Sequence, residues 1–155
     1  MQYRIHSGLY KAADARRRKE WELALRDLNH DAPAGGPTLT VYKGKGDGVQ
    51  LLLASPASDP TIVELAEGDL LPHFSAYGDI IARIAHSTEG DGARSLETLD
   101  YAKKLVHDEA GEFLQEALEA LLTLELTQAR RLFTLIFLVG THLPERLVTF
   151  HRRHS

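Results

Sequence analysis

The sequence predicts an α+β fold, in which an N-terminal helix and a small antiparallel sheet of three or four strands pack with a C-terminal helical half of three or more helices. Short β-branched and aromatic segments cluster between residues 38 and 65, whereas apolar residues recur at helical spacing from residue 69 onward. The chain has 155 residues, of which 43% are hydrophobic and 26% charged. These values are typical of one globular domain, here expected to cover residues 1–155, with a helix-and-sheet part at 1–68, a helical half at 69–143 and a basic tail at 144–155.

The first part of the chain predicts one helix and a meander of strands. Trp21, Leu25 and Leu28 recur at helical spacing, so we expect a helix over 11–28, ended by the prolines and glycines of 29–37. Residues 2–6 alternate in the manner of a strand and are the candidate fourth strand. Three antiparallel strands are expected at 38–42, 49–54 and 61–65, with a glycine-rich hairpin loop at 43–48.

The second part predicts three helices. Asp69 is expected to cap the first helix, which ends in a loop at 87–94, and Ser95 to cap the second. The apolar stripe expected for the second helix is Leu99, Ala102, Val106, Ala110, Phe113, Ala117 and Leu121. Thr127 is expected to cap the last helix, which Gly140 and Pro144 end.

Composition excludes several classes of function. The chain has no cysteine, which excludes disulfides, thiolate metal sites and a cysteine nucleophile. The net charge of -4 argues against a dedicated nucleic-acid binder. The N-terminus lacks the apolar run of a signal peptide, and the longest apolar run, 132–139, is shorter than a membrane span. We therefore expect a cytoplasmic protein with no membrane contact, no cofactor and no metal.

The last two helices differ in charge, and this difference supplies the candidate binding residues. Glu109, Glu112, Glu116 and Glu119 lie on one helix face, where they either recruit a basic partner or divalent cations or form a solvated surface. Arg130 and Arg131 follow Thr127 in the first turn of the last helix, where the helix dipole disfavours cations. They either pair with carboxylates of the preceding helix or hold an anion.

His107 is the candidate catalytic residue. It lies on the apolar side of its helix, where a histidine is either a hydrogen-bonded core residue or a general base tuned by a neighbouring carboxylate such as Glu109. No second histidine stands four residues on, so the spacing does not favour a metal site. The run Arg16–Lys19 and the glycines of 43–48 are better explained as a solvated helix face and a hairpin loop than as nucleic-acid or phosphate sites.

Two segments resemble motifs of a small bacterial family, mainly alphaproteobacterial, of the UPF series of uncharacterised protein families. Val106-His107-Asp108-Glu109-Ala110-Gly111 is similar to its Leu-His-Asn-Glu-Gly motif, and Ala129–Ile136 to its Ala-Arg-Arg-Leu-Phe-Thr-Leu-Ile motif. Here Asp108 replaces the asparagine, Ala110 is an extra residue, and Thr127-Gln128 replaces an Asp-x pair. The resemblance covers about residues 1–140 and implies the α+β layout and a cytoplasmic setting, but no activity. It matches His107, Glu109, Arg130 and Arg131 to family motifs.

Two functions remain open. The first is a non-enzymatic protein-interaction or regulatory module, whose acidic stripe meets a basic partner or whose helices pair two copies. The second is a small enzyme or anion-binding protein, with His107 as base, Glu109 orienting it, and Arg130 or Arg131 holding a phosphate or carboxylate. The second function requires His107 and an arginine to face a common pocket within about 6–8 Å.

Overall fold

The computed structural model describes residues 1–33, 35–90 and 93–141, which form two compact units. The sheet unit comprises Met1–Leu70 and Thr134–Thr141, and the helical unit comprises Leu71–Phe133. The tail expected at 144–155 lies outside the described residues. That the chain is one domain over 1–155 stays a prediction.

The described elements confirm the α+β class. The sheet unit holds β1 (Gln2–Ile5), α1 (Ser7–Ala12), α2 (Ala15–Asn29), β2 (Thr38–Lys43), β3 (Val49–Ser55) and β4 (Ser58–Leu65). The long helices are α3 (Glu67–Gly90), α4 (Ala93–Leu118) and α5 (Leu126–Gly140). The C-terminal half of α5 belongs to the sheet unit and its N-terminal half to the helical unit. Among the described residues, no helix has the length and apolar character required to span a bilayer.

The sheet has the order β1-β2-β3-β4, and the antiparallel β2–β4 meander is confirmed. The expectation of an antiparallel sheet throughout is wrong, because β1 pairs with β2 in parallel. Parallel neighbours need a long crossover connection, and α1 and α2 supply it by returning the chain to the end where β1 began. The sheet is therefore mixed.

The N-terminal helix is divided in two. Ala13 is extended, and the Asp14 side chain then accepts a hydrogen bond of 2.8 Å from the backbone N–H of Arg17, which caps α2. The expected start of this helix at residue 11 is wrong. The Asp14 cap starts α2 at Ala15 instead.

The three caps expected for the later helices are wrong. The Ala66 carbonyl accepts from the N–H groups of Asp69 and Leu70, so α3 begins before Asp69. The Glu125 carbonyl likewise accepts from Ala129, which places Thr127 inside α5. Ser95 lies inside α4, and most of the loop expected at 87–94 is helical.

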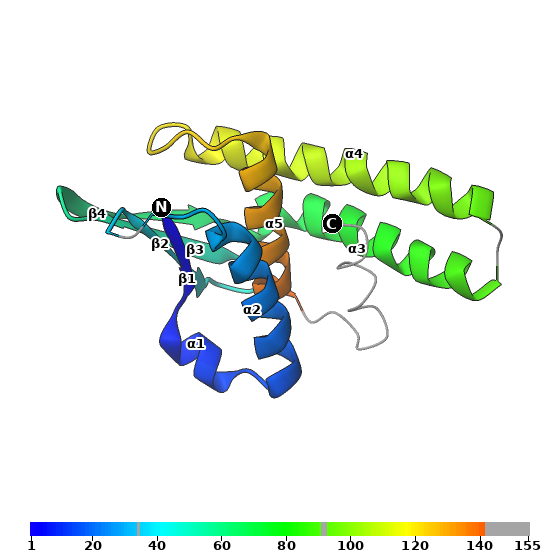
Figure 1. The fold of residues 1–155 in the computed structure, drawn as a ribbon, viewed down its shortest axis with the longest axis horizontal. Coiled ribbons are helices and arrows are strands. Elements are labelled where there is room, and N and C mark those ends of the chain that lie inside the picture. The colour runs from blue at the N-terminus through cyan, green and yellow to red at the C-terminus, as the bar shows by residue number, and fades with distance from the viewer. Residues whose placement is uncertain (34, 91–92, 142–155) are drawn as a thin grey trace. The chain divides into compact units, whose positions relative to one another are not determined.

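In the helical unit, α3 and α4 run antiparallel and side by side (Figure 1), with His73 stacked on Phe113 at 4.8 Å between ring centroids. The buried side chains of α4 include Lys103, His107, Ala110, Leu114 and Leu118. The expected stripe is therefore partly wrong, because Ala117 and Leu121 are exposed. Gly111 explains this rotation: a Cβ atom there would lie 3.0 Å from Leu126 Cδ1 and 3.1 Å from Arg130 Cγ, so its face is the one that α5 approaches.

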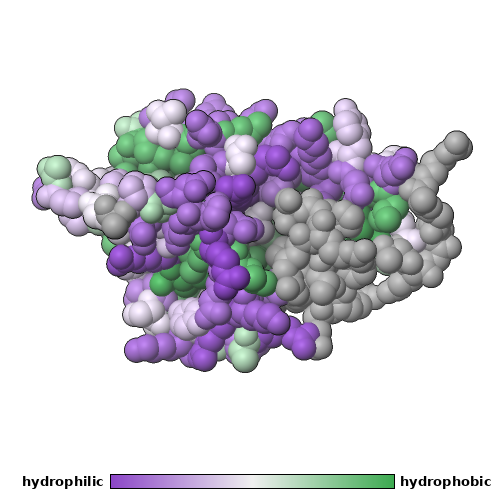
Figure 2. Space-filling view, in the orientation of Figure 1, coloured by the Kyte–Doolittle hydropathy of each residue, from purple (hydrophilic) through white to green (hydrophobic). Residues whose placement is uncertain are grey.

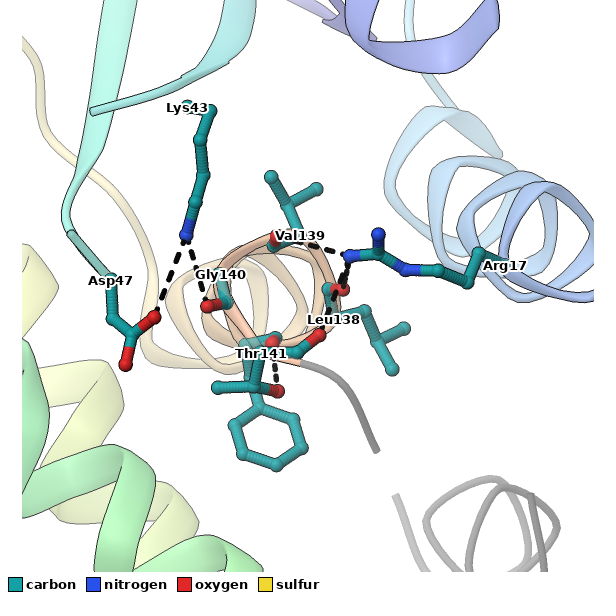
Figure 3. A network of polar contacts seen from close by, with 8 residues as sticks. Arg17, Lys43, Asp47, Leu138, Val139, Gly140 and Thr141 are labelled. Carbon is teal, nitrogen blue, oxygen red and sulfur yellow. Dashed lines mark hydrogen bonds and ion pairs between the residues drawn. The ribbon is translucent and has the colours of Figure 1, made fainter. Parts of the chain in front are cut away.

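In the sheet unit, α2 lies beside the C-terminal turns of α5, and side chains satisfy the last carbonyls of that helix (Figure 3). Arg17 Nη2 lies 3.4 Å from each of the carbonyl oxygens of Leu138, Val139 and Thr141. The indole N–H of Trp21 donates to Leu138 at 3.2 Å, and Lys43 Nζ donates to Gly140 at 3.1 Å. These contacts, the α5 C-terminal network, place two cations at the negative end of the helix dipole.

Arg17→Met is expected to lower the free energy of unfolding by about 1–2 kcal/mol, because buried carbonyls of α5 lose a cationic donor. Urea denaturation of the two proteins measures the difference. Lys19→Met removes an exposed cation from the same helix and is the matched control. Equal losses in the two variants would show that the network does not stabilise α5.

Candidate functional site

The structure brings together two of the six candidate site residues. His107 on α4 is 3% exposed and contacts Arg130 on α5, which is half-buried. The side chains of the other four candidates are exposed: Glu109, Glu112, Glu116 and Arg131. The Arg131 guanidinium lies 3.5 Å from the Gln128 side-chain oxygen one turn earlier on the same helix.

His107 is held as a neutral side chain. Its Nε2–H donates to the backbone carbonyl of Arg130 at 2.8 Å, which fixes the tautomer. The rings of Tyr77 and Phe133 lie 5.3 and 6.0 Å from the imidazole, between ring centroids. Burial among these groups lowers the pKa of His107 to about 4.

Arg130 connects the same two helices a second time through its side chain. Its Nε lies 3.2 Å from Asp108 Oδ1, and both side chains are about a quarter exposed. Asp108 follows His107 directly, so consecutive residues of α4 contact the side chain and the main chain of one arginine. This arrangement agrees with the carboxylate pairing that was one of the two readings for Arg130.

Lys103 is a further member of this cluster that the sequence analysis missed. It is 1% exposed, and its Nζ lies 5.7 Å from the centroid of the Tyr77 ring. Burial lowers the pKa of Lys103 to about 7, although the nearby Asp100 carboxylate acts in the opposite direction. The signal was its position four residues before His107, on the same helix face.

We call Tyr77, Lys103, His107, Asp108 and Arg130 the buried ionisable cluster. Its two buried bases have lowered pKa values, a feature of catalytic sites but also of structural networks. The proton on His107 Nε2 is already donated to a main-chain carbonyl. Among the described residues, no three histidine or carboxylate groups converge in a way that could hold a metal ion. The contacts in this cluster join α3, α4 and α5 within the helical unit.

The outward face of α4 carries a second group of residues, which we call the α4 ridge: Tyr101, Leu105, Glu109, Glu112 and Glu116. Their spacings of four, four, three and four residues place them in one row along the helix. Tyr101 is 66% exposed and Leu105 47% exposed. Figure 2 shows a surface that is largely hydrophilic along α4, with smaller hydrophobic patches between. The ridge is thus apolar in its first half and acidic in its second.

A family model described as "Uncharacterised protein family (UPF0262)" matches residues 63–142, which contain both the buried ionisable cluster and the α4 ridge. A curated relative named "UPF0262 protein", from Sphingopyxis alaskensis (strain DSM 13593 / LMG 18877 / RB2256), is 43% identical over 44 residues. That alignment covers 28% of this chain and 27% of the relative, so the match spans about a quarter of the relative's length. No solved structure matches.

The stability of the protein is expected to rise between pH 7 and 9.5 because of Lys103. In this range the unfolded chain holds a proton on Lys103 that the folded chain releases, so raising the pH favours folding. The rise is at most about 3 kcal/mol for this one group. Urea denaturation across this range measures it, and Lys103→Met should remove it. An identical profile in the variant would contradict the assignment.

The lowered pKa of His107 is expected to destabilise the fold as the pH falls from 6.5 toward 4. In this range the imidazole binds a proton in the unfolded chain but stays neutral in the folded chain, so acid favours unfolding. The loss is up to about 2 kcal/mol by pH 4.5. Nitrogen NMR of the imidazole should show the neutral Nε2–H tautomer down to about pH 4. His107→Gln keeps a donor for the Arg130 carbonyl and should flatten this part of the profile. A charged imidazole at pH 6 would overturn the prediction.

Proposed function

The chain belongs to UPF0262, a family whose description assigns no activity, and we propose that it is a non-enzymatic protein-interaction or regulatory module. Its contact surface in this proposal is the α4 ridge. The observation that carries the proposal is the exposure of Tyr101 and Leu105 beside the glutamates of the same row. The proposal keeps the cytoplasmic setting that the sequence predicts.

The apolar half of the ridge supports a protein partner. The opposite face of α4 is already buried by the core of the helical unit, so Tyr101 and Leu105 are not needed for its packing. A tyrosine contributes a large, rigid contact area at low entropic cost and is enriched at interfaces. Two such side chains one helical turn apart make an anchor for an apolar residue of a partner.

The acidic half of the ridge supports a basic partner. Glu109, Glu112 and Glu116 are exposed, and they lie in one row with Tyr101 and Leu105. Opposite charges across an interface speed association, and like charges placed face to face cost free energy. Pairing the ridge with itself in parallel would bring the glutamates together. A positively charged segment with apolar residues beside its cations fits better.

Nucleic acid is a weaker partner for this chain. In the basic run Arg16–Lys19, Arg17 reaches the α5 carbonyls, and the Arg18 guanidinium donates to the carbonyls of Tyr10 and Lys11. These two cations therefore serve the fold. The α4 ridge is acidic and would repel phosphates.

The alternative, a small enzyme or anion-binding protein using His107, Glu109 and Arg130 or Arg131, has less geometric support. Asp108 already neutralises Arg130, and Glu109 and Arg131 are exposed. Phosphate binding that Arg130→Gln abolishes, measured by calorimetry on the folded variant, would support the alternative over the interaction module.

A fluorescent, helical 18-residue peptide with leucines flanked by lysines is the probe for the α4 ridge, and anisotropy measures its affinity. We expect Tyr101→Ser/Leu105→Ser to weaken binding about tenfold or more, because the anchor is lost. Glu112→Gln/Glu116→Gln should weaken binding mainly at low salt, because its contribution is electrostatic.

Asp27→Asn/Asp31→Asn removes two exposed carboxylates elsewhere and is the control with equal net charge. Its affinity should equal that of the unmodified protein. A peptide that binds all four proteins equally, or none of them, contradicts the proposal.

A further inference from the structure

The basic tail expected at residues 144–155 has the composition that the α4 ridge requires of a partner. The tail lies outside the described part of the chain. Its sequence holds one glutamate against three arginines: Arg146, Arg152 and Arg153. Between these arginines stand three apolar residues: Leu147, Val148 and Phe150. The tail is therefore a positively charged segment with apolar residues beside its cations.

The order of residues in the tail also matches the ridge. In the ridge, Leu105 precedes Glu109 by four residues, which is about 6 Å along a helix. In the tail, Phe150 precedes Arg152 by two residues, which is at most about 7 Å of chain. A tail that runs in the same direction as α4 therefore sets its apolar residues against the apolar half of the ridge and its cations against the acidic half.

The N-terminal half of α5 reaches the border of the ridge. Arg130 Nε lies 3.2 Å from Asp108 Oδ1. Asp108 borders the ridge, because it stands three residues after Leu105 and four before Glu112 on the same helix. From Arg130, α5 continues for about 15 Å to its last residue, Gly140, after which the tail begins.

The tail is long enough to return over this distance. The path from Gly140 runs about 15 Å along α5 and about 10–12 Å across α4. The ten residues from Gly140 to Phe150 span up to about 33 Å, and the twelve to Arg152 up to about 40 Å. Both spans exceed the path, so the length of the tail allows contact with the ridge of its own chain.

We propose that the basic tail occupies the α4 ridge of its own chain and competes there with the partner. This inference rests on the proposed function, since it names the regulation of the same surface. A tethered segment has an effective concentration in the mM range, so a weak contact is enough, and binding within one chain prevails over binding between copies at µM concentrations. The partner has to displace the tail, which lowers the partner's apparent affinity.

A spin label on the full chain tests the contact. The chain has no cysteine, so Thr149→Cys carries a single nitroxide beside Phe150. We expect the amide NMR signals of Tyr101, Leu105 and Glu109 to broaden to the same degree at all protein concentrations. When labelled, unenriched protein is mixed with unlabelled, isotope-enriched protein, these signals should stay sharp. Sharp signals in the labelled protein, or broad signals in the mixture, would overturn the inference.

The fluorescent peptide used for the ridge measures the competition. In the full chain, Arg152→Glu/Arg153→Glu should tighten peptide binding about threefold or more, because the tail no longer covers the glutamates. The same substitutions should remove the broadening caused by the label. Lys19→Glu/Lys45→Glu makes the same change of net charge at two exposed lysines of the sheet unit and is the matched control. Equal tightening in the two variants would contradict the competition.

The two experiments separate this inference from the proposed function. Broadening of the ridge signals in a protein that binds no peptide contradicts the proposed partner and supports the contact of the tail. Peptide binding that the tail substitutions leave unchanged contradicts the competing tail and leaves the proposed function supported.

Discussion

The sheet unit depends on how the buried C-terminal end of α5 satisfies its carbonyl groups. Residues 132–140 are all buried, so water does not reach most of the polar main-chain groups that a helix end leaves without intrahelical donors. Arg17 and Trp21 from α2 and Lys43 from β2 provide the donors. Because long donors must reach this point, α2 and the end of β2 have to lie beside it. The apolar helix alone would tolerate many orientations, but its carbonyls restrict them.

The helical unit also satisfies a carbonyl of α5 with a side-chain donor, but here the donor is a buried base whose burial costs desolvation free energy. There the donor to α5 is His107, and the acceptor is the carbonyl of Arg130 in the N-terminal half of the helix. Lys103 and His107 are buried on the same face of α4, and both are more easily kept neutral than in water. The core of this unit thus includes two bases, where leucines would avoid the desolvation cost. What the ionisable groups give in return is directional contact among three helices.

Periodicity and β-branched runs predicted the β2–β4 meander and the long helices, because local signals determine these elements. The same signals missed α1 and misplaced the ends of the later helices. The direction of β1 was not predictable from its own residues, since it depends on the crossover through α1 and α2. The buried face of α4 was predicted only in part, because it includes Gly111, where the missing side chain lets α5 approach closely. A search for recurring apolar side chains does not detect a glycine.

The candidate site was also predicted only in part from the sequence. His107 lies near Arg130, a proximity that only tertiary packing creates. Lys103 was missed, although its spacing from His107 placed it on the inward face of the helix. Glu109 and Arg131 are neighbours of buried residues in sequence, but a helix turns each of them about 100–200° away. Adjacent positions in a motif are therefore poor guides to a shared pocket.

The division of α5 between the two units has a consequence for the order of folding. The indole N–H of Trp21 donates to the carbonyl of Leu138, a residue 117 positions later, so the sheet unit contains contacts of very long range in sequence. During synthesis, residues 1–70 emerge before α5, so the hydrogen bonds of Trp21 and Lys43 to the end of that helix form only after the last described helix has been made. The synthesis of α5 is in this sense required before the N-terminal half reaches its native state.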